Sequence, residues 1–188
     1  MAQRSAWRER LKHVDVKRLV FLDESGAKTN MTRLYARSKK GQRALDYAPR
    51  EHWNTTTMVA GVTWSAPIAP MVLDGPMDAD AFEAYVAQVL APALPPASIV
   101  VMDNLSPHKT ASIEPTIQNA QSELWYLPPY SPDVNPIEHM WSQIKSHLRS
   151  ARAEAKEELW SAVAAALAKV TPEDTQGYFL DSVVGIIN

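Results

Sequence analysis

Arg18-Leu19-Val20-Phe21-Leu22-Asp23 contains four consecutive apolar residues that end abruptly in an acid, and Glu24-Ser25-Gly26 follows directly. A short apolar run bounded by charged and turn-forming residues is typical of a buried strand. This segment therefore predicts a strand in the interior of the protein that ends in a carboxylate.

Further strands and helices extend outward from this segment. We expect strands at 55–64, 68–73, 98–103 and 123–127, and helices starting at Asp78 and Ser112, at 136–150, at 154–169 and, briefly, from Thr171. The basic segment 27–53 between the first two strands is predicted to be an inserted loop or a short hairpin, with a turn at Lys39-Lys40-Gly41. Strands cluster first and then alternate with helices, which predicts an α/β domain with a mixed sheet.

The composition limits the class of protein. With 188 residues, 46% of them hydrophobic and 21% charged, the chain can bury the core of one domain. The absence of cysteine excludes disulfide scaffolds, Cys-ligated zinc, iron–sulfur clusters and cysteine nucleophiles. The N-terminus has no apolar signal-peptide region and no run of about 18 apolar residues occurs, so neither secretion nor membrane spanning is indicated.

The basic residues are concentrated at the start of the chain. The net charge is −2 and the isoelectric point is near 6.2, which taken alone argues against a phosphate-backbone partner. Residues 1–50, however, carry thirteen Lys and Arg against five Asp and Glu, a balance of +8, whereas the other 138 residues have a balance of −10. This asymmetry indicates an anionic partner on one face, and a solvated basic surface is the alternative.

Three acidic residues lie at positions where α/β proteins commonly bind ligands. Asp23 and Asp103 each end a predicted buried strand, and Glu138 lies on the polar face of the predicted helix 136–150. Ligands of α/β proteins bind at the C-terminal ends of strands. Three converging carboxylates repel one another, and a hard divalent cation such as Mg²⁺ resolves that conflict. Each acid taken singly has an alternative role as a turn former, helix cap or first-turn acid.

Three sequence blocks carry a family resemblance. They are Phe21-Leu22-Asp23-Glu24-Ser25-Gly26, Val101-Met102-Asp103-Asn104-Leu105-Ser106-Pro107-His108-Lys109, and Leu127-Pro128-Pro129-Tyr130-Ser131-Pro132-Asp133-Val134-Asn135-Pro136-Ile137-Glu138. They resemble the signature blocks of the DDE transposases of the mariner-like superfamily, in its bacterial insertion-sequence branch. Thirty-four residues separate Asp103 from Glu138, which matches the spacing typical of that superfamily. The resemblance covers roughly residues 16–150.

The resemblance implies a fold, a site and a reaction. The fold is an RNase H-like mixed five-stranded sheet, three antiparallel strands then two parallel, flanked by helices. The implied division is a basic N-terminal extension (1–18), a catalytic domain (19–150) and additional C-terminal helices packed on the same domain (151–188). Asp23, Asp103 and Glu138 are the implied catalytic residues and the ligands of two Mg²⁺ or Mn²⁺ ions. The implied reaction is attack of water on a DNA phosphodiester at the element end, followed by attack of the liberated 3′-hydroxyl on target DNA.

Other residues are candidates for supporting roles. Asn104 and His108 are expected to position water or substrate beside Asp103. DNA contacts are expected from basic residues in the inserted segment and on the polar stripe of the helix 136–150, namely Lys28, Arg33, Arg37, Lys39, Lys40, Arg43, Lys145 and Arg149. A solvated face is the alternative for the last two. Glu24 should point to the opposite face of the strand from Asp23, in a surface or supporting role.

The start of the chain departs from the family. Full-length relatives carry a helix-turn-helix region that reads terminal inverted repeats, and the roughly 18 residues before the first strand are too few for one. We expect that this region is encoded on a separate chain from an upstream frame, or that it has been lost.

The expected partners are double-stranded DNA, at the element ends and at the target, and a second copy of the chain in a dimer. The expected location is the bacterial cytoplasm, at the nucleoid. The alternatives are an inactive truncated remnant that only binds DNA or dimerises, and another RNase H-like nuclease.

Overall fold

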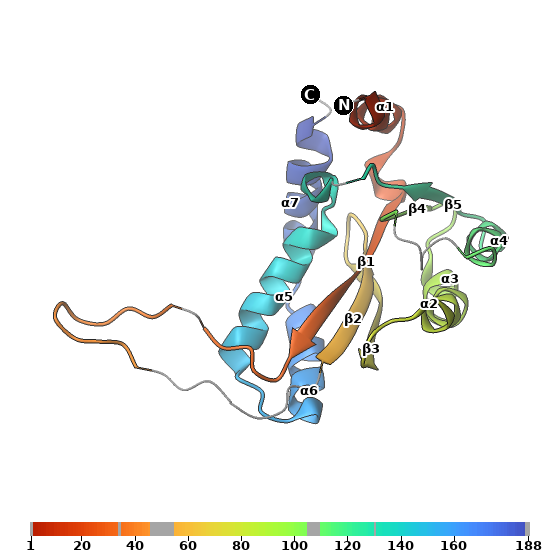
Figure 1. Cartoon of the computed structure of the whole chain (residues 1–188). Coiled ribbons are helices and arrows are strands. Elements are labelled where there is room, and N and C mark those ends of the chain that lie inside the picture. Colours follow the sequence, from red (N-terminus) through yellow and green to blue (C-terminus); the bar gives the residue numbers. More distant parts are fainter. Residues whose placement is uncertain (1, 34, 46–54, 105–109, 130, 187–188) are drawn as a thin grey trace.

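A five-stranded sheet forms the centre of the protein. The computed structural model describes residues 2–33, 35–45, 55–104, 110–129 and 131–186. Its strands are β1 (Leu19–Lys28), β2 (Thr55–Val62), β3 (Pro67–Asp74), β4 (Ile99–Met102) and β5 (Glu123–Tyr126), in the spatial order β3-β2-β1-β4-β5 (Figure 1). β1, β2 and β3 pair antiparallel, while β1, β4 and β5 pair parallel. The predicted mixed sheet is confirmed.

The central strand β1 is longer than its apolar run predicts. The sequence pattern ends the strand at the acids, but Asp23 to Lys28 continue as a ladder with Ala60 to Thr55 of β2. Pairing with β4 covers only Leu19 to Phe21. Asp23 therefore lies two residues beyond the last β1–β4 pair, beside the point where β4 ends.

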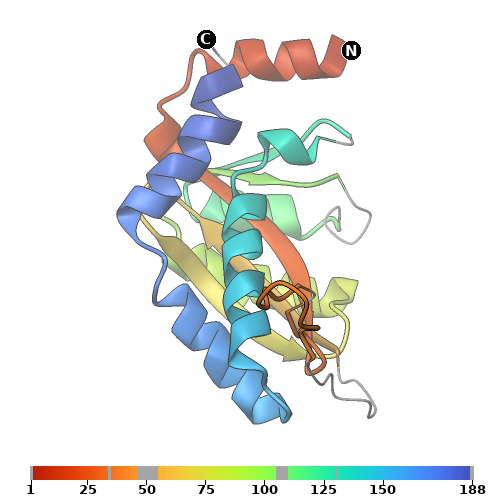
Figure 2. The same ribbon diagram turned by 90° about the vertical axis from the view of Figure 1, so that its left-hand side faces the viewer.

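Helices cover both faces of the sheet. One face is packed by α1 (Ala2–Leu11), α5 (Ile137–Ala151), α6 (Lys156–Leu167) and α7 (Pro172–Ser182), and the other by α2 (Ala79–Tyr85), the π-helical turn η2 (Val86–Leu90) and α4 (Ile113–Asn119). Figure 2 shows α5 in front of the sheet, where it packs over β1. Short helical turns complete the chain at η1 (Val16–Arg18), α3 (Ala91–Ala93), η4 (Pro132–Val134) and η5 (Val184–Ile186). No helix in the described ranges has the length and apolar character needed to span a bilayer.

The strand alternation of β1 assigns its acids to opposite faces. Leu19, Phe21 and Ala27 belong to the core under α5, whereas Leu22 belongs to the core under α2. Because successive side chains of a strand point to opposite faces, Asp23 belongs to the α5 side and Glu24 to the α2 side. The prediction that Glu24 points away from Asp23 is confirmed.

Helix starts follow the capping chemistry of the sequence. Asp78 caps α2, its Oδ1 accepting a hydrogen bond from the backbone N–H of Ala81 at 2.8 Å. The Thr171 hydroxyl accepts from the backbone N–H of Asp174 at 3.1 Å, and the Asp174 carboxylate accepts in return from the backbone N–H of Thr171 at 3.0 Å. This reciprocal cap supports an α7 of 11 residues, longer than the brief helix expected there.

The described chain begins with α1, a helix that the sequence pattern did not predict. The segment expected to be a basic extension contains α1, whose Trp7 and Leu11 are buried in the core. The Trp7 ring packs edge-on against Trp125 with ring centroids 6.0 Å apart, and the Arg10 guanidinium lies 3.3 Å from the centroid of the Trp125 ring. Two apolar residues on one face were too weak a signal without knowledge of this partner.

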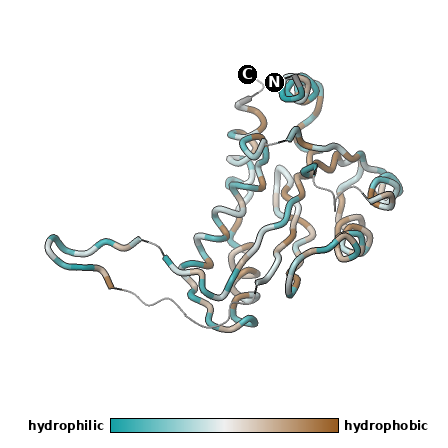
Figure 3. The backbone as a smooth tube through the Cα atoms, in the orientation of Figure 1, coloured by the Kyte–Doolittle hydropathy of each residue, from teal (hydrophilic) through white to brown (hydrophobic). Residues whose placement is uncertain are grey.

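The segment after β1 is a basic arm, by which we mean residues 29–45. In its described residues it forms no helix or strand, and it stands out from the body of the protein (Figure 1). The turn at Lys39-Lys40-Gly41 is present, with Gly41 at a φ of 85° and the Gln42 N–H donating to the Lys39 carbonyl at 2.9 Å. Residues 35–45 are predominantly hydrophilic (Figure 3). Of the predicted segment 27–53, residues 27–28 continue β1, and the described residues from 29 to 45 form a loop, not a hairpin; residues 46–53 lie outside the described residues.

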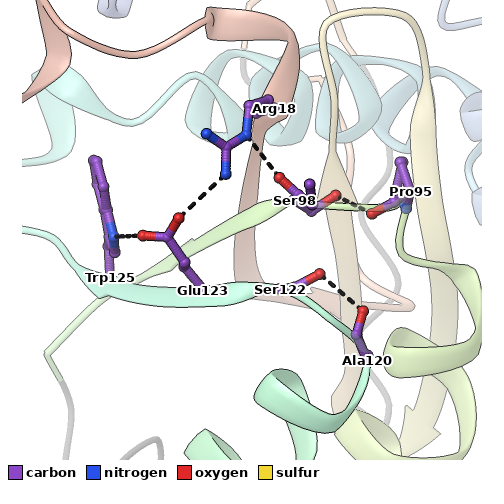
Figure 4. A network of polar contacts seen from close by, with 8 residues as sticks. Arg18, Pro95, Ser98, Ala120, Ser122, Glu123 and Trp125 are labelled. Carbon is purple, nitrogen blue, oxygen red and sulfur yellow. Dashed lines mark hydrogen bonds and ion pairs between the residues drawn. The ribbon is translucent and has the colours of Figure 1, made fainter.

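An ion-pair network joins the starts of three strands. Arg18 donates from Nε to the Ala97 carbonyl at 2.8 Å and from its terminal nitrogen to Glu123 Oε1 at 3.1 Å. The indole N–H of Trp125 donates to the other Glu123 oxygen at 3.2 Å (Figure 4). Since these residues lie at or beside the beginnings of β1, β4 and β5, the network holds the parallel half of the sheet in register at the edge opposite to Asp103.

Candidate active site

One cleft collects the three acids from separate parts of the chain. It has a volume of about 410 Å³ and opens where β4 and β5 end. Asp23 comes from β1, Asp103 follows β4, and Glu138 lies in the first turn of α5. The remaining lining comes from Asn104 and from the segment between β5 and α5, namely Leu127, Pro128, Pro129, Ser131, Pro132 and Asn135. The structure thus brings together the three carboxylates named from the sequence.

Asp23 is the electrostatically strained member of this group. Burial, together with repulsion from Glu138 and, to a smaller extent, from Glu24 and Asp103, raises its pKa to about 7. The hydrogen bond that its Oδ1 accepts from the backbone N–H of Glu24, at 2.8 Å, acts in the opposite direction and is too weak to offset burial. An ionised Asp23 therefore needs a compensating cation, which is the property expected of a metal ligand.

The donor chemistry of the cleft fits a hard divalent cation. All three candidate ligands are carboxylates, and oxygen-only sets select Mg²⁺ or Mn²⁺ over softer metals. Asp23 is partly buried and Glu138 is exposed at the mouth of the cleft. As they stand, no three histidine or acidic side chains in the described ranges converge closely enough to hold one ion. The three acids thus share a cleft and a mutual repulsion, and the ion itself would draw them together.

A rigid connection leads from β5 to Glu138. The Ser131 hydroxyl donates to the Pro129 carbonyl at 3.2 Å, and backbone N–H groups of Val134 and Asn135 donate to Ser131 and Pro132 carbonyls at 3.3 and 3.1 Å. Asp133 forms an ion pair with Arg4 of α1. Because four prolines also restrict this backbone, the segment fixes where α5 begins.

The first turn of α5 is also held from behind by α7. His139, next to Glu138, places Nε2 3.1 Å from Asp181 Oδ2, and its ring stacks on Tyr178 with centroids 6.0 Å apart. One turn later, Gln143 donates to Asp174 at 3.2 Å and accepts a hydrogen bond from the Tyr178 hydroxyl. Contacts between α5 and α7 therefore hold the turn of α5 that carries Glu138.

Of the two residues expected to position water or substrate, the structure describes Asn104 only. Asn104 is exposed and lines the cleft beside Asp103, as expected from its place after β4. His108 lies outside the described residues. Asn135, a residue of the third sequence block with no role predicted from the sequence, is 4% exposed and lines the same cleft. Its position before Pro136 and three residues ahead of Glu138 was a signal, but burial cannot be read from an Asn-Pro pair.

The basic candidates form a path from the cleft to the arm. Lys145 and Arg149 are partly buried on α5, about two and three turns beyond Glu138 on the same stripe. Lys28 is exposed at the end of β1, and Arg33 donates to the Ser150 hydroxyl at 2.9 Å, which ties the arm to the end of α5. The other four arm candidates, Arg37, Lys39, Lys40 and Arg43, are exposed.

The part of the chain that carries the three acids is similar to known proteins. A family model described as DDE superfamily endonuclease matches residues 18–160, which is more than half of the chain and includes all three acids. A curated relative is the transposase of the transposable element Tcb2 from Caenorhabditis briggsae. It is 28% identical over 108 residues, which cover 55% of this chain and 40% of the relative. The chain therefore spans less than half the length of that relative.

Solved structures of Mos1 have the same fold. The Mos1 mariner paired end complex with Mn superposes with a TM-score of 0.78 at 17% identity, covering 98% of this chain and 58% of that chain. The catalytic domain of Mos1 mariner transposase superposes with a TM-score of 0.73 at 16% identity, covering 98% of this chain and 88% of that domain. Together with the strand order, this likeness confirms the RNase H-like fold.

Proposed function

The chain belongs to the DDE superfamily endonuclease family, and we propose that it acts as the catalytic domain of a transposase that cleaves DNA and joins the cleaved end to target DNA. One observation carries the proposal. Asp23, Asp103 and Glu138, separated by up to 115 positions in the sequence, line one cleft at the carboxyl ends of β4 and β5. Their positions in the three sequence blocks and inside the family match support the same assignment.

The three carboxylates are the proposed ligands of two Mg²⁺ or Mn²⁺ ions. Such ions supply an activated water or hydroxyl nucleophile and neutralise charge on the phosphate during in-line displacement. The role of the chain is to present the three carboxylates around one cleft, where a bound cation would keep them ionised and draw them together. The parallel strands fix Asp23 and Asp103, while the proline-rich segment and α7 orient Glu138. Asn104 and His108 are proposed to position water or the scissile strand beside Asp103.

Double-stranded DNA is the proposed partner. Lys145 and Arg149 extend from the cleft toward Lys28, and the basic arm continues beyond them, so a duplex backbone can follow one stripe of positive charge. A duplex carries one negative charge per roughly 1.7 Å of axis, which such a stripe can neutralise in part. We propose binding to element ends and target DNA as a dimer.

The proposed division keeps residues 19–150 as the catalytic domain, with 1–18 before it and the helices of 151–188 packed on it. Burial of Trp7 of α1 and Phe179 of α7 in the same core as β1 supports one structural unit. We further place the source in a bacterial insertion sequence, acting at the nucleoid. This assignment rests on the sequence resemblance alone.

Nicking of supercoiled DNA tests the proposal. With Mg²⁺ or Mn²⁺ the chain is expected to nick the plasmid, together with an upstream helix-turn-helix chain if one is encoded beside it. Asp103→Asn and EDTA should each abolish nicking. Cleavage that survives either change would contradict the proposal. DNA binding without metal-dependent cleavage would favour a remnant that only binds, and preferential cleavage of an RNA–DNA hybrid would favour another RNase H-like nuclease.

A further inference from the structure

One buried polar atom in the wall of the cleft has no hydrogen-bond partner. In the described ranges, four buried side-chain polar atoms lack a partner: Trp7 Nε1, Asn135 Oδ1, Trp141 Nε1 and Ser182 Oγ. Of these residues, Asn135 lines the cleft that also contains the three acids. An unpaired buried carbonyl oxygen has lost its water without gaining a donor, so it destabilises the fold unless a ligand pairs with it.

The backbone holds Asn135 in this position. Its N–H donates to the Pro132 carbonyl at 3.1 Å, and its carbonyl accepts from the Glu138 N–H at 3.2 Å. Pro136 follows directly and restricts Asn135 to extended backbone, observed at φ −116° and ψ 99°. The backbone of Asn135 is therefore fixed beside the start of α5, and the residue stays in the wall of the cleft.

A hydrogen-bond donor that enters the cleft can supply the missing partner. The side chains facing Asn135 across the cleft include Asp23, Asp103 and Glu138, which when ionised only accept hydrogen bonds. Ser131 has already committed its hydroxyl to the Pro129 carbonyl. Mg²⁺ bound by few carboxylates retains several waters, and each of those waters is a strong donor.

We infer that Asn135 is a positioning residue for the hydrated divalent cation, its Oδ1 accepting a hydrogen bond from a water of that ion. This inference rests on the proposed function, because the ion belongs to the proposed carboxylate site. Groups that orient a metal from outside its ligand set commonly change its affinity 10- to 100-fold when they are removed. Asn135 would thus complete a site for which the three acids alone do not converge.

Binding of Mn²⁺ to the full chain, measured by electron paramagnetic resonance of the free ion, tests the inference without activity. Asn135→Leu keeps the approximate size and removes the acceptor, and we expect Mn²⁺ to bind 10- to 100-fold more weakly. The melting temperature in EDTA should not fall, because the buried oxygen has no partner to lose. Ser122→Ala, a change outside the cleft at a buried hydroxyl already bonded to backbone, should leave Mn²⁺ affinity unchanged.

The outcomes separate the inference from the proposed function. Equal Mn²⁺ affinity of the wild type and Asn135→Leu would overturn the inference alone, and so would weaker binding accompanied by an equal loss of metal-free stability. No Mn²⁺ binding by the wild type would overturn both. If Asn135→Leu fails to fold, Asn135→Asp tests the inference in its place. It retains an acceptor at the same place and should bind Mn²⁺ at least as tightly as the wild type, and a tenfold loss would refute the inference.

Discussion

Replacing Asp23 by asparagine should stabilise the metal-free protein. Burial, with repulsion chiefly from Glu138, raises the pKa of Asp23 from 3.8 to about 7. Each unit between these values corresponds to about 1.4 kcal/mol, so ionising Asp23 in the fold costs at most about 4 kcal/mol. Because Asp23 is only partly buried, we expect about 2 kcal/mol. Asparagine occupies the same space without the charge and so avoids this cost.

The pH dependence identifies the cause. The folded state keeps the Asp23 proton to higher pH than the unfolded state, so the free energy of unfolding falls as pH rises from about 4 to about 7 and then levels. Asp23→Asn lacks this fall. In EDTA at pH 8, calorimetry should show its melting temperature about 4–8 °C above the wild type, and at pH 4 the two should coincide. The exposed control Asp80→Asn should change stability by less than about 0.5 kcal/mol. A variant no more stable than the wild type at pH 8 would refute the reasoning.

Three further predictions concern the scaffold and the DNA surface. Thr171→Ala removes the cap of α7 and should cost about 1 kcal/mol in urea denaturation, and an unchanged midpoint would argue against the cap. Gly61→Ala places a Cβ 3.0 Å from a facing isoleucine and should lower the free energy of unfolding by about 1–3 kcal/mol. The Cβ of Gly26→Ala meets nothing within 4 Å, so this variant should be as stable as the wild type. Equal effects of the two changes would contradict this packing. Arg149→Ala should reduce the slope of log DNA affinity against log salt by about 0.9, while the exposed Lys169→Ala should not, and identical slopes would remove Arg149 from the DNA surface.

Local patterns were sufficient to predict most of the sheet and its helices. Apolar runs ending in acids marked β1 and β4, and capping residues such as Asp78 and Thr171 marked the starts of α2 and α7, because both signals act within a few residues. The three carboxylates could be named because strand ends and a helix face are readable from spacing. Their shared cleft follows from the parallel pairing of β1 with β4.

Features that depend on distant partners could not be predicted. The extension of β1 past Asp23 depends on β2, and α1 depends on Trp125, more than 100 positions away from Trp7. The role inferred for Asn135 depends on burial and on the absence of a donor, and neither is visible in an Asn-Pro pair. The support of Glu138 by α7 likewise depends on how two helices pack. Pairing over long sequence distances is decided by packing, which short-range periodicity does not encode.

The central claim is that Asp23, Asp103 and Glu138 form one metal-dependent DNA cleavage centre. Its most direct test compares initial rates of plasmid nicking in Mg²⁺ for Glu138→Gln and Glu24→Gln, two single changes that each remove one negative charge near Asp23. Glu24 belongs to the opposite side of β1, so its variant should nick at the wild-type rate, whereas Glu138→Gln should be at least about 100-fold slower. Equal rates for the two variants would contradict the account.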